Sequence, residues 1–308
     1  MSEEGLRALR RMRALGVEWL AVGPEIRMPD IHAPHLERDP AAIAELDRYL
    51  ERARSEGFRV MLLPRIESPA FFAEPFPFRA DIAMTSDTDW RRFFDSYESL
   101  LLDYARLARR HDVSILCIGL EYRRCVKQDP GRWRRMISAL REVYDGRLTY
   151  SANWWKEALE VPFWDALDYV GIGAYYELVA NGGPMDAAAL DAGWGRVKQE
   201  LGALARQTGK PILFTETGYP GFADAAAWPW KWQFDRDRPI DVQAQAACFE
   251  ALFRNLLPEK WFAGLFIWTF YTDLRWTKPW EYSPEGKPAE AVIRRWYRGR
   301  GLEGRRGG

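Results

Sequence analysis

Two glutamates in this sequence each follow an uninterrupted apolar run. Glu121 comes after Ile115-Leu-Cys-Ile-Gly-Leu120, and Glu216 comes after Pro211-Ile-Leu-Phe-Thr215. Such runs are typical of parallel strands buried on both faces. A carboxylate directly after a buried strand is costly to desolvate unless it is paired or used. Two carboxylates in this setting can serve as a proton donor and as a nucleophile or base.

The chemistry that needs such a pair is the hydrolysis of a glycosidic bond. One carboxyl group protonates the leaving oxygen, and the other attacks the anomeric carbon or activates water. The competing interpretation is structural, because a salt bridge to a nearby arginine also satisfies a buried carboxylate. The candidates for that bridge are Arg65, Arg123 and Arg124.

Strand-like and helical patterns alternate around these two glutamates. Apolar runs predict strands at 17–23, 58–64, 113–119, 148–153, 167–174, 211–215 and 262–268. Amphipathic spacing predicts helices at 3–14, 40–56, 88–111, 130–145, 185–208, 241–256 and 288–298. This alternation predicts an α/β fold in which a parallel sheet is joined by helical crossovers.

The length and pattern suit a (β/α)8 TIM barrel, in which the strand ends carry the catalytic groups. No linker interrupts the pattern, so residues 1–308 are predicted to form a single domain. Only seven strands are found and the chain opens on a helix, so the first β-strand of the barrel is expected to be missing from the N-terminus. Two longer loops, 64–87 and 217–240, are expected on the catalytic face.

Composition excludes several classes of partner and cofactor. The formal net charge is zero, which argues against nucleic acid and anionic membranes. Three cysteines and three histidines show no metal-ligand spacing, and no phosphate-binding glycine loop is present, so no metal and no cofactor are expected. The chain has 15 tryptophans, which suit either core packing or stacking on sugar rings.

The sequence resembles glycoside hydrolase family 113, in the clan of retaining (β/α)8 glycosidases. The resemblance covers most of the chain in family order. It lies in the segments 90–97, 104–108, 117–121, 148–154, 163–175, 210–219 and 286–290. It implies an endo-β-1,4-mannanase that acts on mannan or glucomannan through a covalent glycosyl-enzyme.

The same resemblance implies roles for individual residues. Glu121 is then the acid/base and Glu216 the nucleophile, with carboxyl groups about 5–5.5 Å apart. Tyr175 resembles the clan tyrosine that hydrogen-bonds the nucleophile, although it also suits a core aromatic. Trp268 resembles the platform beneath the sugar at the cleavage point.

Other residues are placed near the site by their positions in the pattern. Asn153 ends the fifth strand of a full barrel and is expected to bind a sugar hydroxyl. Arg65 follows the third and is expected to donate to a hydroxyl or tune a carboxylate. Tryptophans in the expected catalytic-face loops are candidates for further sugar subsites, although each one singly suits packing as well: Trp154, Trp155, Trp228, Trp230, Trp276 and Trp280.

One departure from the clan pattern bears on specificity. Leu120 precedes the candidate acid/base where much of the clan has an asparagine that contacts the 2-hydroxyl. Two alternatives therefore stay open: a glycosidase or transglycosylase for another β-linked glycan, and a carbohydrate-binding pseudoenzyme on a truncated barrel. The first residues lack the apolar core of a signal peptide, which favours a cytoplasmic protein. Secretion is expected only if the natural chain begins upstream of Met1.

Overall fold

The computed structural model describes residues 3–233 and 235–299, and strands alternate with helices along them. The main strands are β1 Trp19–Val22, β3 Arg59–Leu62, β5 Ile115–Leu120, β6 Arg147–Asn153, β7 Val170–Ala174, β8 Ile212–Thr217 and β9 Phe262–Ile267. The long helices are α1 Glu3–Leu15, α2 Pro40–Ser55, α3 Asp87–Arg110, α5 Pro130–Val143, α7 Ala187–Thr208, α8 Val242–Leu256 and α9 Pro288–Gly299. Each element predicted from the sequence is therefore confirmed, with ends that shift by a few residues.

The main strands form one sheet in the order β1-β3-β5-β6-β7-β8-β9. Strand pairs of this sheet with a defined register run parallel, as expected when a helix returns the chain between neighbours. In the part of the chain that the structure describes, α1 comes before β1 and seven strands make up the sheet. The predicted α/β barrel topology without its first strand is thus confirmed for these residues.

The chain divides into two compact units, which are described separately. Unit 1 comprises Met1–Glu18, Ala174–Leu204 and Glu216–Gly308, and unit 2 comprises Trp19–Gly173 and Ala205–Thr215. Strands β7 and β8 each run from one unit into the other. The expectation of a single domain remains a prediction. Across the described ranges, every helix is too short or too polar to cross a membrane.

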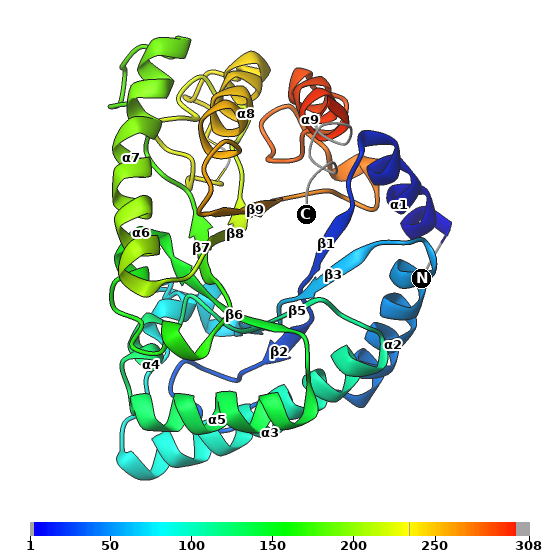
Figure 1. Ribbon diagram of the computed structural model, residues 1–308, viewed down its shortest axis with the longest axis vertical. Helices are drawn as coiled ribbons and strands as arrows, with labels where there is room; N and C mark the ends of the chain where they lie inside the picture. Colours follow the sequence, from blue (N-terminus) through cyan, green and yellow to red (C-terminus); the bar gives the residue numbers. More distant parts are fainter. Residues whose placement is uncertain (1–2, 234, 300–308) are drawn as a thin grey trace. The chain divides into compact units, whose positions relative to one another are not determined.

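Unit 2 is built around an aromatic core beneath the sheet. Helices α3 and α5 lie side by side on it (Figure 1). The buried ring of Trp133 stacks on Phe163 with centroids 5.1 Å apart, and Tyr97 and Tyr150 meet Trp133 edge-on. Edge-to-face pairs are the favoured aromatic geometry. This packing fixes the strands on which candidate site residues lie.

Helix starts in unit 2 follow their capping residues. The Ser86 side chain accepts a hydrogen bond from Asp89 N–H at the start of α3. Asp129 does the same for Arg132 N–H at the start of α5, and Pro130 occupies the first helical position. These side chains satisfy amide groups that have no partner within the helix.

A second sheet in unit 2 was not predicted. Strands β2 (Glu25–Arg27) and β4 (Arg65–Glu67) pair in parallel just beyond β1 and β3. The 3₁₀ helices η1 (Pro69–Phe72) and η2 (Arg79–Asp81) follow β4. The predicted loop 64–87 therefore carries ordered structure that ends close to the candidate site.

Unit 1 packs α9 against both α8 and α1 (Figure 1). Arg11 of α1 pairs with the buried Glu285 at 2.9 Å, which ties the start of the chain to the segment before α9. In the loop 217–240, the Arg238 guanidinium pairs with Asp224 at 2.7 Å and lies 4.1 Å from the centre of the Phe222 ring. The loop is thus held by a charge pair and a ring.

Candidate active site

Glu121 lies directly after β5, all six residues of which are buried. Its pairing with β6 shifts register between Cys117 and Leu120, and the Glu121 backbone takes a left-handed conformation with φ of 58°. A positive φ is uncommon for a residue other than glycine, and a register shift of this kind re-aims a side chain at the end of a strand. The Glu121 N–H still donates to Ser151 O at 2.8 Å, so the turn is anchored to β6.

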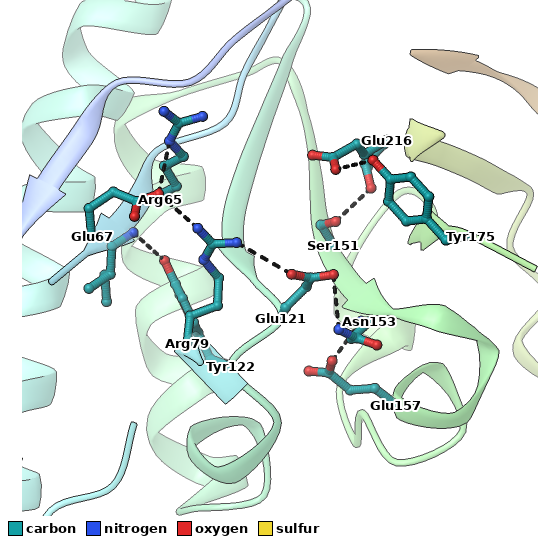
Figure 2. Close-up of polar contacts among 12 residues, drawn as sticks. Arg65, Glu67, Arg79, Glu121, Tyr122, Ser151, Asn153, Glu157, Tyr175 and Glu216 are labelled. Carbon is teal, nitrogen blue, oxygen red and sulfur yellow. Dashed lines mark hydrogen bonds and ion pairs between the residues drawn. The ribbon is translucent and has the colours of Figure 1, made fainter. Parts of the chain in front are cut away.

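Glu121 is 9% exposed, and its carboxylate has partners on both oxygens. Arg79 Nη1 lies 3.5 Å from Oε2, and Asn153 Nδ2 donates to Oε1 at 3.0 Å. Figure 2 shows Arg79 and Asn153 on opposite sides of the carboxylate. A Cβ atom at Gly173 would lie 3.2 Å from Oε1, so the bare backbone of β7 leaves room for this oxygen.

The ion-pair partner of Glu121 differs from the arginines expected from the sequence. Arg123 pairs with Glu160 at 3.0 Å, and Arg124 pairs with Asp81 at 3.7 Å. That part of the structural alternative was wrong because the short helix α4 (Arg123–Val126) directs both side chains to other acidic partners. Arg79 takes the position instead, from η2 in the loop after β4.

A row of alternating charges extends from Glu121 into the small sheet. Glu67 pairs with Arg79 at 2.7 Å and with Arg65 at 3.2 Å, and Arg65 pairs with Glu25 at 3.0 Å. The Arg79 guanidinium also lies 4.8 Å from the centre of the Phe78 ring. Arg65, predicted to donate to a hydroxyl or tune a carboxylate, pairs with Glu67 and Glu25, and its role in the site stays a prediction. Opposite charges at these distances hold one another in place.

Asn153 ends β6 and reaches Glu121 from the opposite side to Arg79. Its backbone N–H donates to Glu157 Oε2 at 2.6 Å, at the start of the short helix α6 (Trp154–Ala158). Glu157 is 1% exposed, and burial raises its pKa from 4.5 to about 7. The backbone of Trp154 and Trp155 lies in α6, but the side chains of these two predicted residues lie outside what the structure describes.

Glu216 lies on β8 in unit 1, and its partner is the predicted one. Tyr175, just after β7, donates its hydroxyl hydrogen to Glu216 Oε1 at 2.5 Å, as Figure 2 shows. The Tyr175 ring meets Tyr282 edge-on at 6.1 Å, and the Tyr282 hydroxyl donates to Pro229 O at 2.5 Å. Burial raises the pKa of Tyr282, and the negative charge of Glu216 contributes to this rise.

The predicted tryptophans of unit 1 differ in their surroundings. Trp268 follows β9 and is 39% exposed. Its backbone N–H donates to Thr217 O at 2.8 Å, and its peptide bond to Thr269 is cis. Trp230 is 38% exposed and its indole donates to Glu177 at 3.0 Å. Trp276 is 66% exposed in the 3₁₀ helix Leu274–Trp276. Exposed rings of this kind are available to stack on a ligand.

Sequence reasoning missed Arg79, Tyr150 and Glu157. Arg79 lies in a loop segment without periodicity, so no pattern marks it. Tyr150 lies on the same strand as Asn153, and Glu157 follows Asn153 by four residues at the start of a helix. That four-residue spacing was the available signal, because it lets a side chain reach back to the first amides of a helix. Among the described residues, no group of three or more metal-ligating side chains forms a metal site.

Comparisons with known proteins point to one family. Residues 1–279 match the sequence profile of Glycoside Hydrolase Family 113. A solved GH113 β-1,4-mannanase is 26% identical with a TM-score of 0.82, over 97% of this chain and 94% of that chain. The GH113 β-mannanase AaManA from Alicyclobacillus acidocaldarius, solved in complex with ManMIm, is 25% identical with a TM-score of 0.82, over 97% and 92%.

A more distant structure shares the fold alone. A β-glucuronidase from Ruminococcus gnavus is 12% identical with a TM-score of 0.64, over 95% of this chain and 46% of that chain. No curated protein matches the sequence at a significant level.

Proposed function

The chain belongs to glycoside hydrolase family 113, and on that basis we propose that it hydrolyses β-1,4-mannosidic bonds in mannan or glucomannan with retention of configuration. The similar solved structures that are named β-1,4-mannanases support the choice of glycan. The observation that carries the proposal is that the two strand-terminal glutamates have different partners. Glu216 accepts the Tyr175 hydroxyl, whereas Glu121 lies between Arg79 and Asn153.

In the first step we assign Glu216 as the nucleophile. A Glu216 oxygen attacks the anomeric carbon while Glu121 gives its proton to the glycosidic oxygen, so the C–O bond breaks as a glycosyl ester forms. The Tyr175 hydrogen bond orients Glu216 for this attack. Once Glu121 has lost its proton it is negative, and the Arg79 guanidinium 3.5 Å away stabilises that charge.

In the second step Glu121 acts as a base. It takes a proton from water, the water oxygen attacks the anomeric carbon, and the ester to Glu216 breaks. Retention requires the two carboxyl groups to flank one bond at about 5–5.5 Å, whereas about 6.5–9.5 Å suits inversion. We assign Trp268 as the platform beneath the reacting sugar, and Trp230 and Trp276 as further stacking positions. We assign the Asn153 side-chain amide two hydrogen bonds, one to Glu121 and one to a sugar hydroxyl.

A substrate panel with two active-site variants tests the proposal. Wild-type protein is expected to release oligosaccharides from mannan and glucomannan faster than from β-glucan or xylan. Glu216→Ala is expected to abolish release, and Glu121→Ala to lower it by about 10²–10⁴-fold. Cleavage of mannan that survives Glu216→Ala would overturn the assignment. Preferential cleavage of another glycan would change the proposed substrate and leave the proposed roles of Glu121 and Glu216 in place.

Azide separates the two roles. It is small enough to enter the space left by either deleted carboxylate. With an activated aryl mannoside, Glu216→Ala should yield the α-mannosyl azide, because azide replaces the nucleophile directly. Glu121→Ala should yield the β-mannosyl azide, because azide then replaces water after the glycosyl-enzyme has formed. The opposite pattern would exchange the two assignments.

A further inference from the structure

A buried carboxylate, Glu157, lies behind the candidate acid/base in unit 2. Its Oε1 accepts the Tyr150 hydroxyl at 2.7 Å, and its Oε2 accepts the backbone N–H of Asn153 at 2.6 Å. Figure 2 shows the second of these contacts directly beneath Glu121. Glu157 is 1% exposed, so these hydrogen bonds replace the water that a carboxylate would otherwise bind.

Two chains of hydrogen bonds, called routes below, connect Glu157 to Glu121. In the first, Glu157 holds the Asn153 backbone, and the Asn153 side chain donates to Glu121 Oε1 at 3.0 Å. In the second, Tyr150 donates to Glu157 and accepts the N–H of Tyr122 at 2.7 Å. Tyr122 is the residue after Glu121, whose backbone is left-handed. Glu157 thus supports both the side chain and the turn of Glu121.

We propose that Glu157 is a positioning residue for Glu121, and that its ionised form holds the acid/base in the geometry that cleaves glycosides. This inference rests on the proposed function, since it assigns a task within that site. Glu157 touches neither substrate nor reacting atoms. It acts through Asn153 and Tyr150.

The hydrogen-bond donors around Glu157 favour its ionised form. The Tyr150 oxygen already accepts Tyr122 N–H, and the Tyr150 hydrogen needs an acceptor, which is Glu157 Oε1. The Asn153 N–H needs Oε2. A proton on either carboxyl oxygen faces one of these donors, so protonation breaks or weakens one of the two routes. The network is complete only when both oxygens are acceptors.

The charged and titratable groups that face Glu157 come from β6, from α4 and from the segment after α6. Tyr150 of β6 and the Asn153 amide favour its ionised form, as does Arg123 of α4, while Glu160 opposes it. Burial outweighs the favourable contacts and raises the pKa of Glu157 to about 7. Cys125 of α4 is also near Glu157. Burial raises the pKa of its thiol, and the charge of Glu157 adds to this rise. The switch between the two forms of Glu157 therefore falls near neutral pH.

The test compares Glu157→Gln and Tyr150→Phe with wild type across pH 4.5–9, using mannan hydrolysis. An amide at 157 has one acceptor oxygen, so it keeps one route and loses the other. Both variants are expected to lower kcat about 10-fold above pH 7 with little change in KM. Wild-type kcat should rise with pH as Glu157 ionises near pH 7, and this rise should be absent in Glu157→Gln. Glu160→Gln is the matched control, because the Glu160 carboxylate pairs with Arg123 and Lys127, and its charge acts on Glu157 only through space.

The outcomes separate this inference from the function on which it rests. An inactive wild-type protein would overturn the proposed function. An active wild type with an unchanged kcat and pH profile in Glu157→Gln would overturn the positioning role alone. Equal losses in Glu160→Gln and Glu157→Gln would also contradict it, since the effect would then be general to the segment.

A conservative variant provides a further check on the role of the two acceptor oxygens. Glu157→Asp keeps both oxygens on a shorter side chain, so it should retain more of the wild-type kcat than Glu157→Gln and should keep the change in kcat with pH. A lower kcat in Glu157→Asp than in Glu157→Gln, without that change, would contradict the need for an ionised group.

Discussion

At the scale of single residues, two carboxylates that look alike in sequence differ in their partners. Glu216 accepts a short hydrogen bond from Tyr175, and Glu121 lies between a guanidinium and an amide. Both glutamates can be recognised from the sequence, because a carboxylate directly after a buried strand is costly to desolvate unless it is paired or used. The sequence does not mark Arg79, because a loop residue that pairs through space leaves no periodic signal.

The Tyr175 hydroxyl is expected to contribute to catalysis through Glu216. Tyr175→Phe keeps the ring that meets Tyr282 and removes the hydrogen bond at 2.5 Å. A hydrogen bond to a charged group is worth enough to lower kcat about 10–100-fold when it is lost. Steady-state kinetics on mannan-oligosaccharides measure this. An unchanged kcat would show that the hydroxyl has no part in the reaction.

Arg79 is expected to matter for stability as well as for activity. Arg79→Met removes from Glu67 and Glu121 a shared guanidinium that is only 15% exposed, at a cost of about 3 kcal/mol in the free energy of unfolding. Urea unfolding measures the change, and kcat should fall with it. Arg124→Met is the control, because its pair with Asp81 is exposed and should contribute less than about 1 kcal/mol. Equal effects in both variants would contradict this expectation.

At the scale of elements, the strands and long helices follow from the apolar patterns, whereas short elements do not. Strands β2 and β4 have three residues each, too few for a period to show. The register shift in β5 and the left-handed turn at Glu121 also leave no pattern, because they depend on how β5 meets β6. The site therefore depends on irregularities that only the folded strands reveal.

The contact between β5 and β6 explains why position 119 is a glycine. A Cβ atom there would come within 2.6 Å of the Tyr150 ring. Gly119→Ala is therefore expected to displace Tyr150, to lower the free energy of unfolding by about 1–3 kcal/mol, and to reduce kcat. Urea unfolding and kinetics test both effects. Gly195→Ala in α7 is the control: its Cβ would meet nothing within 4 Å, so it should be neutral or stabilising.

At the scale of the whole molecule, the family and its fold were both predicted from the sequence and are confirmed by the matched profile and the similar structures. A property of the whole molecule that was not predicted is the dependence of its stability on pH. The fold favours the neutral form of Glu157, whereas the proposed catalysis uses the ionised form. Such opposition between stability and activity is common at functional sites.

Stability is expected to fall as Glu157 ionises. Its pKa in the fold is about 7 against an ordinary value of 4.5. A carboxyl group with a raised pKa stabilises the fold fully below its unfolded pKa, and this contribution is lost as pH rises towards the folded pKa. The loss from pH 4.5 to 7 amounts to about 3 kcal/mol. Unfolding curves should show this slope in wild type and a shallower one in Glu157→Gln. Identical slopes would contradict it.

The proposed function depends above all on Glu216, which attacks the substrate and forms a covalent glycosyl-enzyme. That ester can be trapped with an activated 2-deoxy-2-fluoro-β-mannoside, and digestion followed by mass spectrometry then locates the label. We expect one sugar on the peptide that contains Glu216, and no label on Glu216→Ala protein. A label on Glu121 or another residue, or rapid turnover of mannan with an inverted product, would contradict the assignment.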